Sequence, residues 1–383
     1  MFERTIFTAE HEMFRDAAAR FVAEHVEPHH AAWEKDGMVS REMWLKAGAQ
    51  GLLCVTVPEE YGGPGADFLF ASIVLEEFVK ANASGPGLSV HSDIVAPYLV
   101  AYASEELKRA WLPKMCAGEA IGAIAMTEPG VGSDLQSMRT RAVRDGDDWV
   151  VSGQKTFISN GQLADFVIVA AKSDPAARGK GVSLILVETD RPGFSRGRNL
   201  EKIGYKAQDT SELFFEDVRV PAANLVGLEG RGFVQLMEQI PQERLTQAVR
   251  AATMMEAALD WTVAFTRERQ AFGRAVSDFQ NTRFKLAEIR TQAVMHRVFV
   301  DRCIEMHLEG KLTAVDAAMA KMASTEAMNV VMDMCLQLHG GSGYMWEMPI
   351  ARAWADARMS RIAGGTGEIM RELIGRDLVG RGA

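Results

Sequence analysis

The stretch QIPQERLTQAVRA contains a single carboxylate that could do proton chemistry, Glu243, placed just after a proline at the apparent start of a helix. A carboxylate acts as a base near neutral pH when burial or its neighbours raise its pKa. The same pattern is also ordinary helix-end chemistry, because an acid offsets the positive end of the helix dipole and proline suits the first helical position. This stretch alone favours the structural interpretation.

A second stretch, AMTEPGVGSD, combines glycines with hydroxyl groups at the end of an expected strand. Gly130 and Gly132 allow the backbone to approach a planar or phosphorylated ligand closely. Thr127 and Ser133 can hydrogen-bond the polar edge of such a ligand. No helix in a βαβ unit follows, so this is not a dinucleotide fingerprint, and the chain has no P-loop. A tight loop would need the same glycines.

Three more stretches carry groups that could contact a ligand. KTFISNG places Phe157 and Ser159 on one face of a strand end, which suits a flat heteroaromatic ring as well as any strand edge. QLHGGSGYMWE ends a long helix in three glycines and exposes backbone polar groups. RIAGGTGEIMREL begins a terminal helix whose free N–H groups can receive an anion or a polarised oxygen.

A helix break in RERQAFGRAVSDFQ brings Arg269, Phe272 and Gln280 into one short segment around Gly273. Gln280 has a structural explanation too, because Ser277 and Gln280 are spaced as a capping box.

The elements that must position these residues change in character twice along the chain. Apolar residues recur at helical spacing at the start and again after about residue 230, whereas short β-branched and aromatic runs lie between. The connections between these runs are too short for βαβ crossovers, so the expected sheet or barrel is antiparallel. The sequence predicts an α+β, mainly α, fold with an N-terminal helical domain over 1–118, a middle antiparallel β domain over 119–228 and a C-terminal four-helix bundle over 229–383.

Composition narrows the class of protein. The chain has 383 residues and a net charge of −9, which gives no electrostatic case for nucleic acid or an anionic membrane. Its four scattered cysteines, its histidine spacing and its acidic N-terminus give no sign of a disulfide framework, a metal site or a signal peptide. No apolar run is long enough to span a bilayer, and we expect a cytoplasmic protein.

Taken together and in order, these stretches resemble the acyl-CoA dehydrogenase family over essentially the whole chain. MTEPGVGSD is similar to one family signature, GQKTFISNG to the segment that packs on the flavin, and FFEDVRVP to the segment that closes the β domain. RQAFG and QLHGGSGY resemble the contacts with the flavin diphosphate and adenosine. The resemblance implies an FAD enzyme in which a carboxylate takes the α-proton of an acyl-CoA thioester, hydride leaves to flavin N5, and electrons pass to an electron-transferring flavoprotein.

The sequence departs from the common family pattern at the expected base. Most members carry it before the terminal helix in a pattern like E-G-T, where this chain has Ala363 and Gly364 followed by Gly365 and Thr366. In the long-chain branch the base lies instead at the start of a bundle helix in the pattern P-Q-E-R-L, which residues 241–245 match in full. The resemblance therefore implies that Glu243 is the base and that the N–H of Gly364 polarises the thioester carbonyl.

The remaining roles are carried over position by position. The resemblance assigns FAD contacts to Met126, Thr127, Ser133, Phe157, Ile158, Ser159, Arg269, Phe272, Gln280, Gln337, Gly340, Gly341, Thr366 and Glu368. It assigns acyl-CoA contacts to Ser133, Gln242, Arg244, Gly364 and Gly365. Phe157 replaces a frequent tryptophan and Ala363 a frequent aromatic residue, which leaves substrate size open.

The resemblance thus implies α,β-dehydrogenation of a long-chain or branched acyl-CoA to the trans-2-enoyl-CoA by a homodimer or homotetramer, with the FAD arm held across a subunit interface. Two alternatives stay open. An acyl-CoA oxidase would pass electrons to oxygen, although such chains usually carry an extra C-terminal domain. A non-catalytic acyl-CoA- and FAD-binding subunit of a heteromeric complex would explain the glycine at 364.

Overall fold

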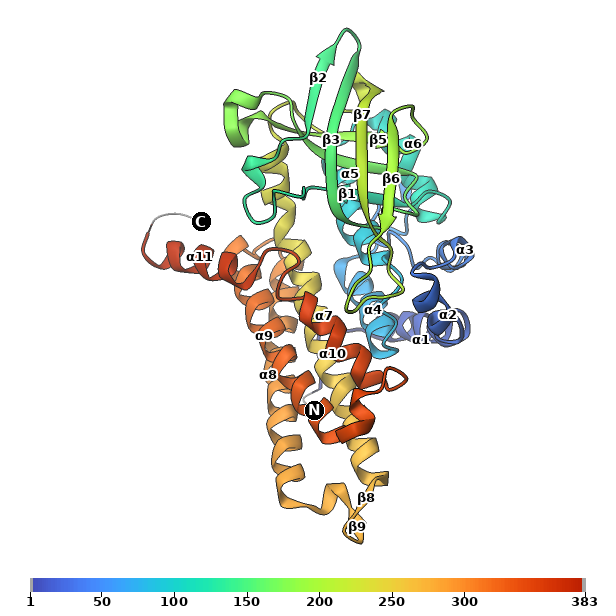
Figure 1. Ribbon diagram of the computed structural model, residues 1–383, viewed down its shortest axis with the longest axis vertical. Helices are drawn as coiled ribbons and strands as arrows, with labels where there is room; N and C mark the ends of the chain where they lie inside the picture. Colours follow the sequence, from blue (N-terminus) through green and yellow to red (C-terminus); the bar gives the residue numbers. More distant parts are fainter. Residues whose placement is uncertain (1–2, 381–383) are drawn as a thin grey trace.

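The computed structural model describes residues 3–380 and has three regions in chain order: helices, a sheet, and a helical bundle (Figure 1). The first region surrounds the buried α4 and includes a short π-helix, η2, directly before α5. Its helices are α1 (Ala9–His25), α2 (Glu27–Asp36), α3 (Arg41–Ala49), α4 (Phe68–Lys80), η2 (Val90–Val95), α5 (Ala96–Tyr102) and α6 (Glu105–Cys116).

The sheet region follows in the order β1-β4-β2-β3-β7-β6, with β5 paired to β4. Its strands are β1 (Gly122–Ala125), β2 (Arg141–Asp145), β3 (Asp148–Ser159), β4 (Phe166–Lys172), β5 (Val182–Glu188), β6 (Phe194–Asn199) and β7 (Thr210–Pro221). The expectation of a purely antiparallel sheet is wrong, because β4 pairs in parallel with both β1 and β2. Between β2 and β4 the chain returns along the antiparallel strand β3, so the parallel pairing needs no crossover helix.

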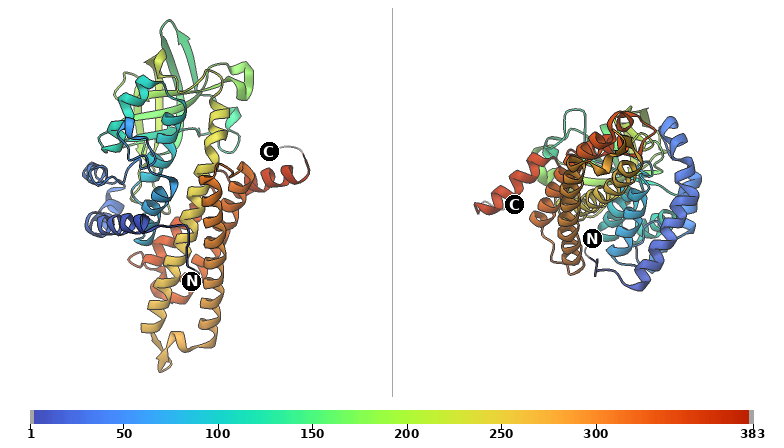
Figure 2. Two further views of the ribbon diagram at one scale, coloured as in Figure 1. Left: turned by 180° about the vertical axis from the view of Figure 1, so that it is seen from behind. Right: turned by 90° about the horizontal axis from the view of Figure 1, so that it is seen from below.

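The third region is the helical bundle. Its elements are α7 (Gly232–Glu268), the hairpin strands β8 (Gln270–Ala271) and β9 (Arg274–Ala275), α8 (Gln280–Leu308), α9 (Ala314–His339), α10 (Pro349–Met359) and α11 (Gly367–Leu378). Figure 2 shows the N-terminal helices on one side of this bundle and α11 projecting from the other. The predicted capping box at Ser277 and Gln280 is wrong: α8 begins at Gln280 with Phe279 at the N-cap, and no side chain caps it.

The start of α7 is a second correction that bears on function. The sequence predicts a helix beginning near Pro241, whereas α7 begins at Gly232 and continues through the proline. The two turns before Pro241 are held by burial of Leu236 and by the Gln235 side-chain amide, which donates to the Val226 carbonyl at 3.1 Å. Proline removes one helical hydrogen bond, but packing on both sides sustains the helix. Glu243 therefore lies in the helix interior, where it cannot offset the charge of the N-terminus.

Two hydrophobic cores meet at the sheet. Alternate residues of β4 point to opposite faces, so Phe166 and Ile168 join the core shared with the helices while Val167 and Val169 join a core inside the sheet region. Burial on both faces explains the continuous apolar runs in the sequence. Within residues 3–380, no helix combines the length and apolar character needed to cross a membrane.

Candidate active site

The Glu243 carboxyl group faces the N-terminal helices from the interior of α7. The Tyr98 hydroxyl, on α5, donates a hydrogen bond to Glu243 Oε1 at 3.0 Å, and Tyr98 itself is fully buried. Although Glu243 keeps some solvent exposure, burial of its carboxyl raises the pKa to about 7, against the opposing effects of the Tyr98 hydrogen bond and the Arg244 charge. The group can therefore both take and hold a proton near neutral pH.

Gly364 lies over α7 one turn beyond Glu243. A Cβ atom added at Gly364 would approach Gln247 Cγ at 3.8 Å, and Gln247 lies four residues after Glu243 on the same helix face. Gly364 has a φ of +67°, a left-handed conformation that glycine adopts without strain. The structure thus places Gly364 against the face of α7 that carries Glu243, one turn away from it.

One buried cation holds the backbone beside Gly364, and a second lies close to it. The Lys321 ammonium, on α9, donates to the Gly365 carbonyl at 2.7 Å and is fully buried. Arg244 is buried as well, and its Nη2 lies 4.0 Å from the position of a Cβ added at Gly365. Burial, together with the charge of the nearby Arg244, lowers the pKa of Lys321 to about 8.

Two of the predicted acyl-CoA contacts have different outcomes. The Nε atom of Arg244 is buried and finds no hydrogen-bond partner among residues 3–380, so this side chain can still donate to a ligand. The Gln242 amide instead donates to the Asp93 carbonyl at 2.8 Å and ties α7 to η2. Ser133 is exposed on the loop between β1 and β2, and it lies far from Gln242 and Arg244 in the sequence.

The predicted flavin contacts of the sheet region form an open surface at the end of β3. Phe157 is 69% exposed and has a φ of +60°, which is strained for an aromatic residue. A β-bulge between Lys155 and Ile158 produces this conformation. Met126, Thr127 and Ser159 are partly exposed. Strain of this kind gathers at ligand sites, and an exposed ring is a surface on which a flat ligand can stack.

For Ile158 the structure leaves the backbone as the part that can meet the predicted cofactor. Its side chain is 2% exposed and packs in the core inside the sheet region, because the bulge turns it inward. Only its backbone remains to contact a cofactor. The Thr127 hydroxyl donates to the Thr156 carbonyl, which leaves its oxygen free to accept a hydrogen bond.

Six more of the predicted FAD contacts lie at the end of α7 that is far from the sheet. The β8–β9 hairpin lies at the opposite end of this helix from the sheet (Figure 1). The end of α9 lies beside the same end of α7, because the His339 ring stacks on Phe265 with the two ring centroids 4.3 Å apart. The exposed residues of this group are Arg269, Phe272, Gln280, Gln337, Gly340 and Gly341. The 37 residues of α7 span about 55 Å, so one chain does not bring this group to Phe157.

Thr366 and Glu368 lie at the start of α11. The Thr366 hydroxyl caps the helix by accepting from the Ile369 N–H at 3.4 Å, and Glu368 is exposed in the first turn. Both follow directly on Gly364 and Gly365 along the chain.

Sequence reasoning missed Tyr98, Lys321 and Gln247. Tyr98 lies in an ordinary apolar helix, and nothing local marks it as a partner of Glu243. Lys321 did leave a signal, since it is a single cation within the apolar stretch AAMAKMAS. A lysine at such a position is buried only when it has a partner.

Three family models match the chain: the acyl-CoA dehydrogenase N-terminal domain over residues 8–119, the middle domain over 123–218 and the C-terminal domain over 230–379. The mitochondrial long-chain specific acyl-CoA dehydrogenase of Sus scrofa is 52% identical over 378 residues, which cover 98% of this chain and 88% of the relative.

Solved structures agree with this relative. The crystal structure of an acyl-CoA dehydrogenase from Geobacillus kaustophilus is 48% identical with a TM-score of 0.96, covering 98% of this chain and 100% of that one. A glutaryl-CoA dehydrogenase from Mycobacterium smegmatis in complex with FADH2 is 28% identical with a TM-score of 0.91, covering 98% and 96%.

Proposed function

Because the chain belongs to the acyl-CoA dehydrogenase family, we propose that it converts a long-chain or branched acyl-CoA to the trans-2-enoyl-CoA with FAD, and that Glu243 is its base. The observation that carries this proposal is that Gly364 lies against the face of α7 from which Glu243 projects. A site with a carboxylate at 243 and none at 364 retains one base. The presence of this carboxylate also weighs against the alternative of a non-catalytic subunit.

The residues of the sheet region fit a flavin. The Phe157 ring is exposed for stacking, Thr127 can accept a hydrogen bond, and a Cβ added at Gly130 or Gly132 would meet no atom within 4 Å, so a ligand can come close. When bound, FAD supplies the acceptor for the β-hydride. Phe157 and Ser159 would hold the ring system, with Met126, Thr127 and the Ile158 backbone beside them.

Each residue around Glu243 has a separate task in the proposed reaction. Glu243 takes the α-proton of the acyl chain, and its pKa near 7 keeps a useful fraction ionised at neutral pH. The Tyr98 hydroxyl orients the carboxylate through its hydrogen bond. The N–H of Gly364 polarises the thioester carbonyl, and Lys321 fixes that backbone through the Gly365 carbonyl. Arg244 and Ser133 bind the CoA arm.

Removing the Tyr98 hydroxyl tests the assignment of Glu243 through pH. The hydroxyl donates to the carboxylate and so stabilises its ionised form. For Tyr98→Phe we expect the pKa of Glu243 to rise, so that the acid limb of the kcat/KM profile moves to higher pH by about one unit. Tyr102→Phe is the matched control, because Tyr102 donates to Glu238 in the same way. Equal profiles for native protein and Tyr98→Phe would contradict the role of Glu243.

The division of the FAD contacts between the two ends of α7 supports an oligomer. We propose a homodimer or homotetramer in which the hairpin region of one subunit binds the diphosphate–adenosine arm of the FAD held by the sheet region of another. The hairpin region supplies the charge and polar groups for this, with Arg269 and Gln280 exposed beside the 96% exposed Phe272. Gln337, Gly340 and Gly341 complete it, while Thr366 and Glu368 stay with the flavin end.

Arg269→Ala tests this division. Loss of the guanidinium removes a charge-assisted hydrogen bond to phosphate, so we expect FAD affinity to fall about tenfold or more. Flavin content after gel filtration, read from absorbance near 450 nm, measures the change. The control is Arg267→Ala, which removes an equally exposed arginine from the last turn of α7. An unchanged flavin content in Arg269→Ala would remove this residue from the site.

A substrate panel tests the proposed reaction itself. Anaerobic bleaching by palmitoyl-CoA, compared with isovaleryl-CoA, separates long-chain from branched specificity. Addition of electron-transferring flavoprotein or of oxygen then separates a dehydrogenase from an oxidase, since rapid peroxide release occurs only with the oxidase. The electron-transferring flavoprotein as acceptor and the cytoplasmic location both remain predictions.

A further inference from the structure

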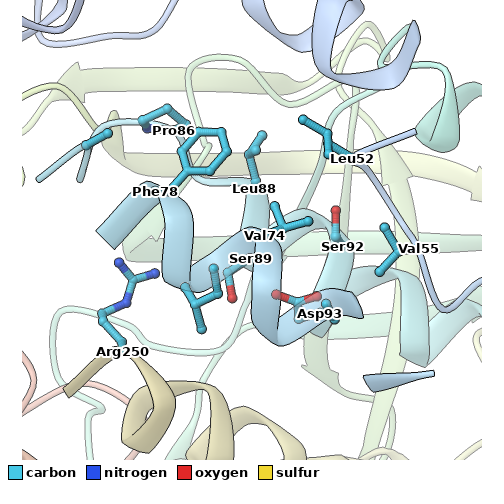
Figure 3. Close-up of a pocket in the computed structure, with 13 residues that line it drawn as sticks. Leu52, Val55, Val74, Phe78, Pro86, Leu88, Ser89, Ser92, Asp93 and Arg250 are labelled. Carbon is cyan, nitrogen blue, oxygen red and sulfur yellow. The ribbon is translucent and has the colours of Figure 1, made fainter. Parts of the chain in front are cut away.

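A small cavity lies beside α7 two helical turns beyond Glu243 (Figure 3). It is enclosed by α4, by the segment that leads into η2, and by Arg250 of α7. The centre of a water molecule can occupy about 20 Å³ of it, which is room for about one water or one terminal group of a chain. Most of its wall is apolar, with Val74, Phe78 and Leu88 among the lining residues.

The rest of the wall is polar in a way that an alkyl chain does not need. Ser89 and Asp93 face the cavity from the π-helical segment, and Arg250 projects toward them from α7 (Figure 3). Asp93 is buried, and burial raises the pKa of its carboxyl to about 7. Buried polar groups at the end of an apolar cavity favour a ligand atom that can hydrogen-bond to them.

Arg250 has donors to spare. Its guanidinium lies 5.9 Å from the centroid of the Tyr205 ring and interacts with the Tyr205 hydroxyl. The charges of Asp93 and Asp356 lie near enough to feel it, but no close ion pair among residues 3–380 includes Arg250. A guanidinium has five N–H donors, and a single aromatic hydroxyl nearby satisfies few of them.

The spacing along α7 connects this cavity to the proposed base. Glu243 and Arg250 are seven residues apart, so they share a helix face at a separation of about 10 Å. An extended chain advances roughly 1.2 Å per bond, so an acyl chain whose α-carbon meets Glu243 reaches the level of Arg250 after about eight or nine bonds. Because the α-carbon is C2, C10 or C11 lies level with Arg250, and the terminal group of a chain of about twelve carbons lies just beyond it, in the cavity.

We infer that Arg250 and Asp93 form the distal end of the acyl pocket and select acyl-CoA substrates that carry a hydroxyl group at the end of the chain. A hydroxyl satisfies both groups at once, accepting from the Arg250 guanidinium and donating to the Asp93 carboxyl. A terminal carboxylate fits less well because it would lie against Asp93. A terminal methyl offers neither group a hydrogen bond, so the donors and acceptors that Tyr205 and Ser89 do not use stay unpaired. This inference rests on the proposed function, since it extends the acyl chain from Glu243.

The test compares 12-hydroxydodecanoyl-CoA with dodecanoyl-CoA on the FAD-loaded protein. For the native protein we expect kcat/KM to be about tenfold or more higher for the hydroxylated substrate. In Arg250→Leu the ratio of the two kcat/KM values should fall to about one. Arg250→Lys keeps a charged donor and should retain part of the preference.

Asp93→Asn provides a second, isosteric variant should Arg250→Leu fail to fold, and it too should reduce the preference by roughly tenfold. The outcomes separate the two proposals. If the native protein oxidises both substrates equally and Arg250→Leu does the same, the cavity holds only a water molecule and the inference is wrong. If neither substrate bleaches the flavin in the native protein, the proposed function fails and the inference fails with it.

Discussion

Glu243→Gln is expected to abolish flavin reduction by acyl-CoA without loss of FAD. Glutamine keeps the shape of the side chain and can still contact the Tyr98 hydroxyl, but it cannot take a proton. The anaerobic rate of flavin bleaching by palmitoyl-CoA should fall by about 10³- to 10⁴-fold. Stopped-flow absorbance measures this rate, and the flavin spectrum of the resting variant confirms that the cofactor is still bound.

The matched control for this variant is Glu238→Gln. Glu238 also lies on α7 and also accepts from a tyrosine, Tyr102, at 2.8 Å, but it is exposed. We expect its bleaching rate to stay near that of the native protein. Should Glu243→Gln bleach as fast as Glu238→Gln, another carboxylate is the base.

Stability gives a further check on Glu243. Burial raises the pKa of its carboxyl to about 7 in the folded protein, from about 4.3 in an unfolded chain. The folded state therefore binds the proton more tightly, and this group makes the fold less stable as pH rises between these two values. Glu243→Gln should lose that part of the pH dependence and melt no lower than the native protein at pH 8. A lower melting temperature would mean that its lost activity reflects a damaged fold.

Gly364→Pro is expected to reduce turnover by about 10²- to 10³-fold, the usual cost of removing one donor to a developing oxyanion. Proline has no N–H, and its fixed φ near −65° also conflicts with the φ of +67° at this position. The measurement is kcat with palmitoyl-CoA, together with the binding of a substrate analogue that has no thioester carbonyl. Loss of kcat with little change in that binding would place the defect at the carbonyl.

Gly364→Ala separates the N–H from the backbone conformation. Alanine keeps the N–H, and its Cβ meets only Gln247 Cγ at 3.8 Å, so the left-handed strain of about 1–2 kcal/mol is the main cost. We expect alanine to retain kcat within about tenfold of native. If alanine is as damaging as proline, the backbone conformation matters and the N–H does not.

Local sequence patterns predicted much of what the structure contains. Strand and helix periodicity separated the three regions, because alternation and 3.6-residue spacing follow directly from which faces are buried. The spacing of Thr313 and Asp316 is that of a capping box, and the Thr313 hydroxyl accepts from the Asp316 N–H at 3.1 Å. Local chemistry was misleading at Pro241, where a helix-start pattern lies inside a 37-residue helix. Packing of Leu236 and its neighbours outweighs the missing hydrogen bond there.

What the sequence by itself determined, then, is the family and the identity of the exceptional residues, Glu243 and Gly364. These follow from residue types in a fixed order, which needs no coordinates. Only the tertiary structure decided their surroundings. Tyr98 is distant from Glu243 in the chain, yet its hydroxyl hydrogen-bonds the Glu243 carboxylate. Lys321 and Gln247 are distant from residue 364 in the chain, yet Lys321 bonds the carbonyl of the next residue, Gly365, and Gln247 faces Gly364. The pKa of a carboxyl depends on desolvation and on neighbours within a few ångströms, and folding alone creates that environment.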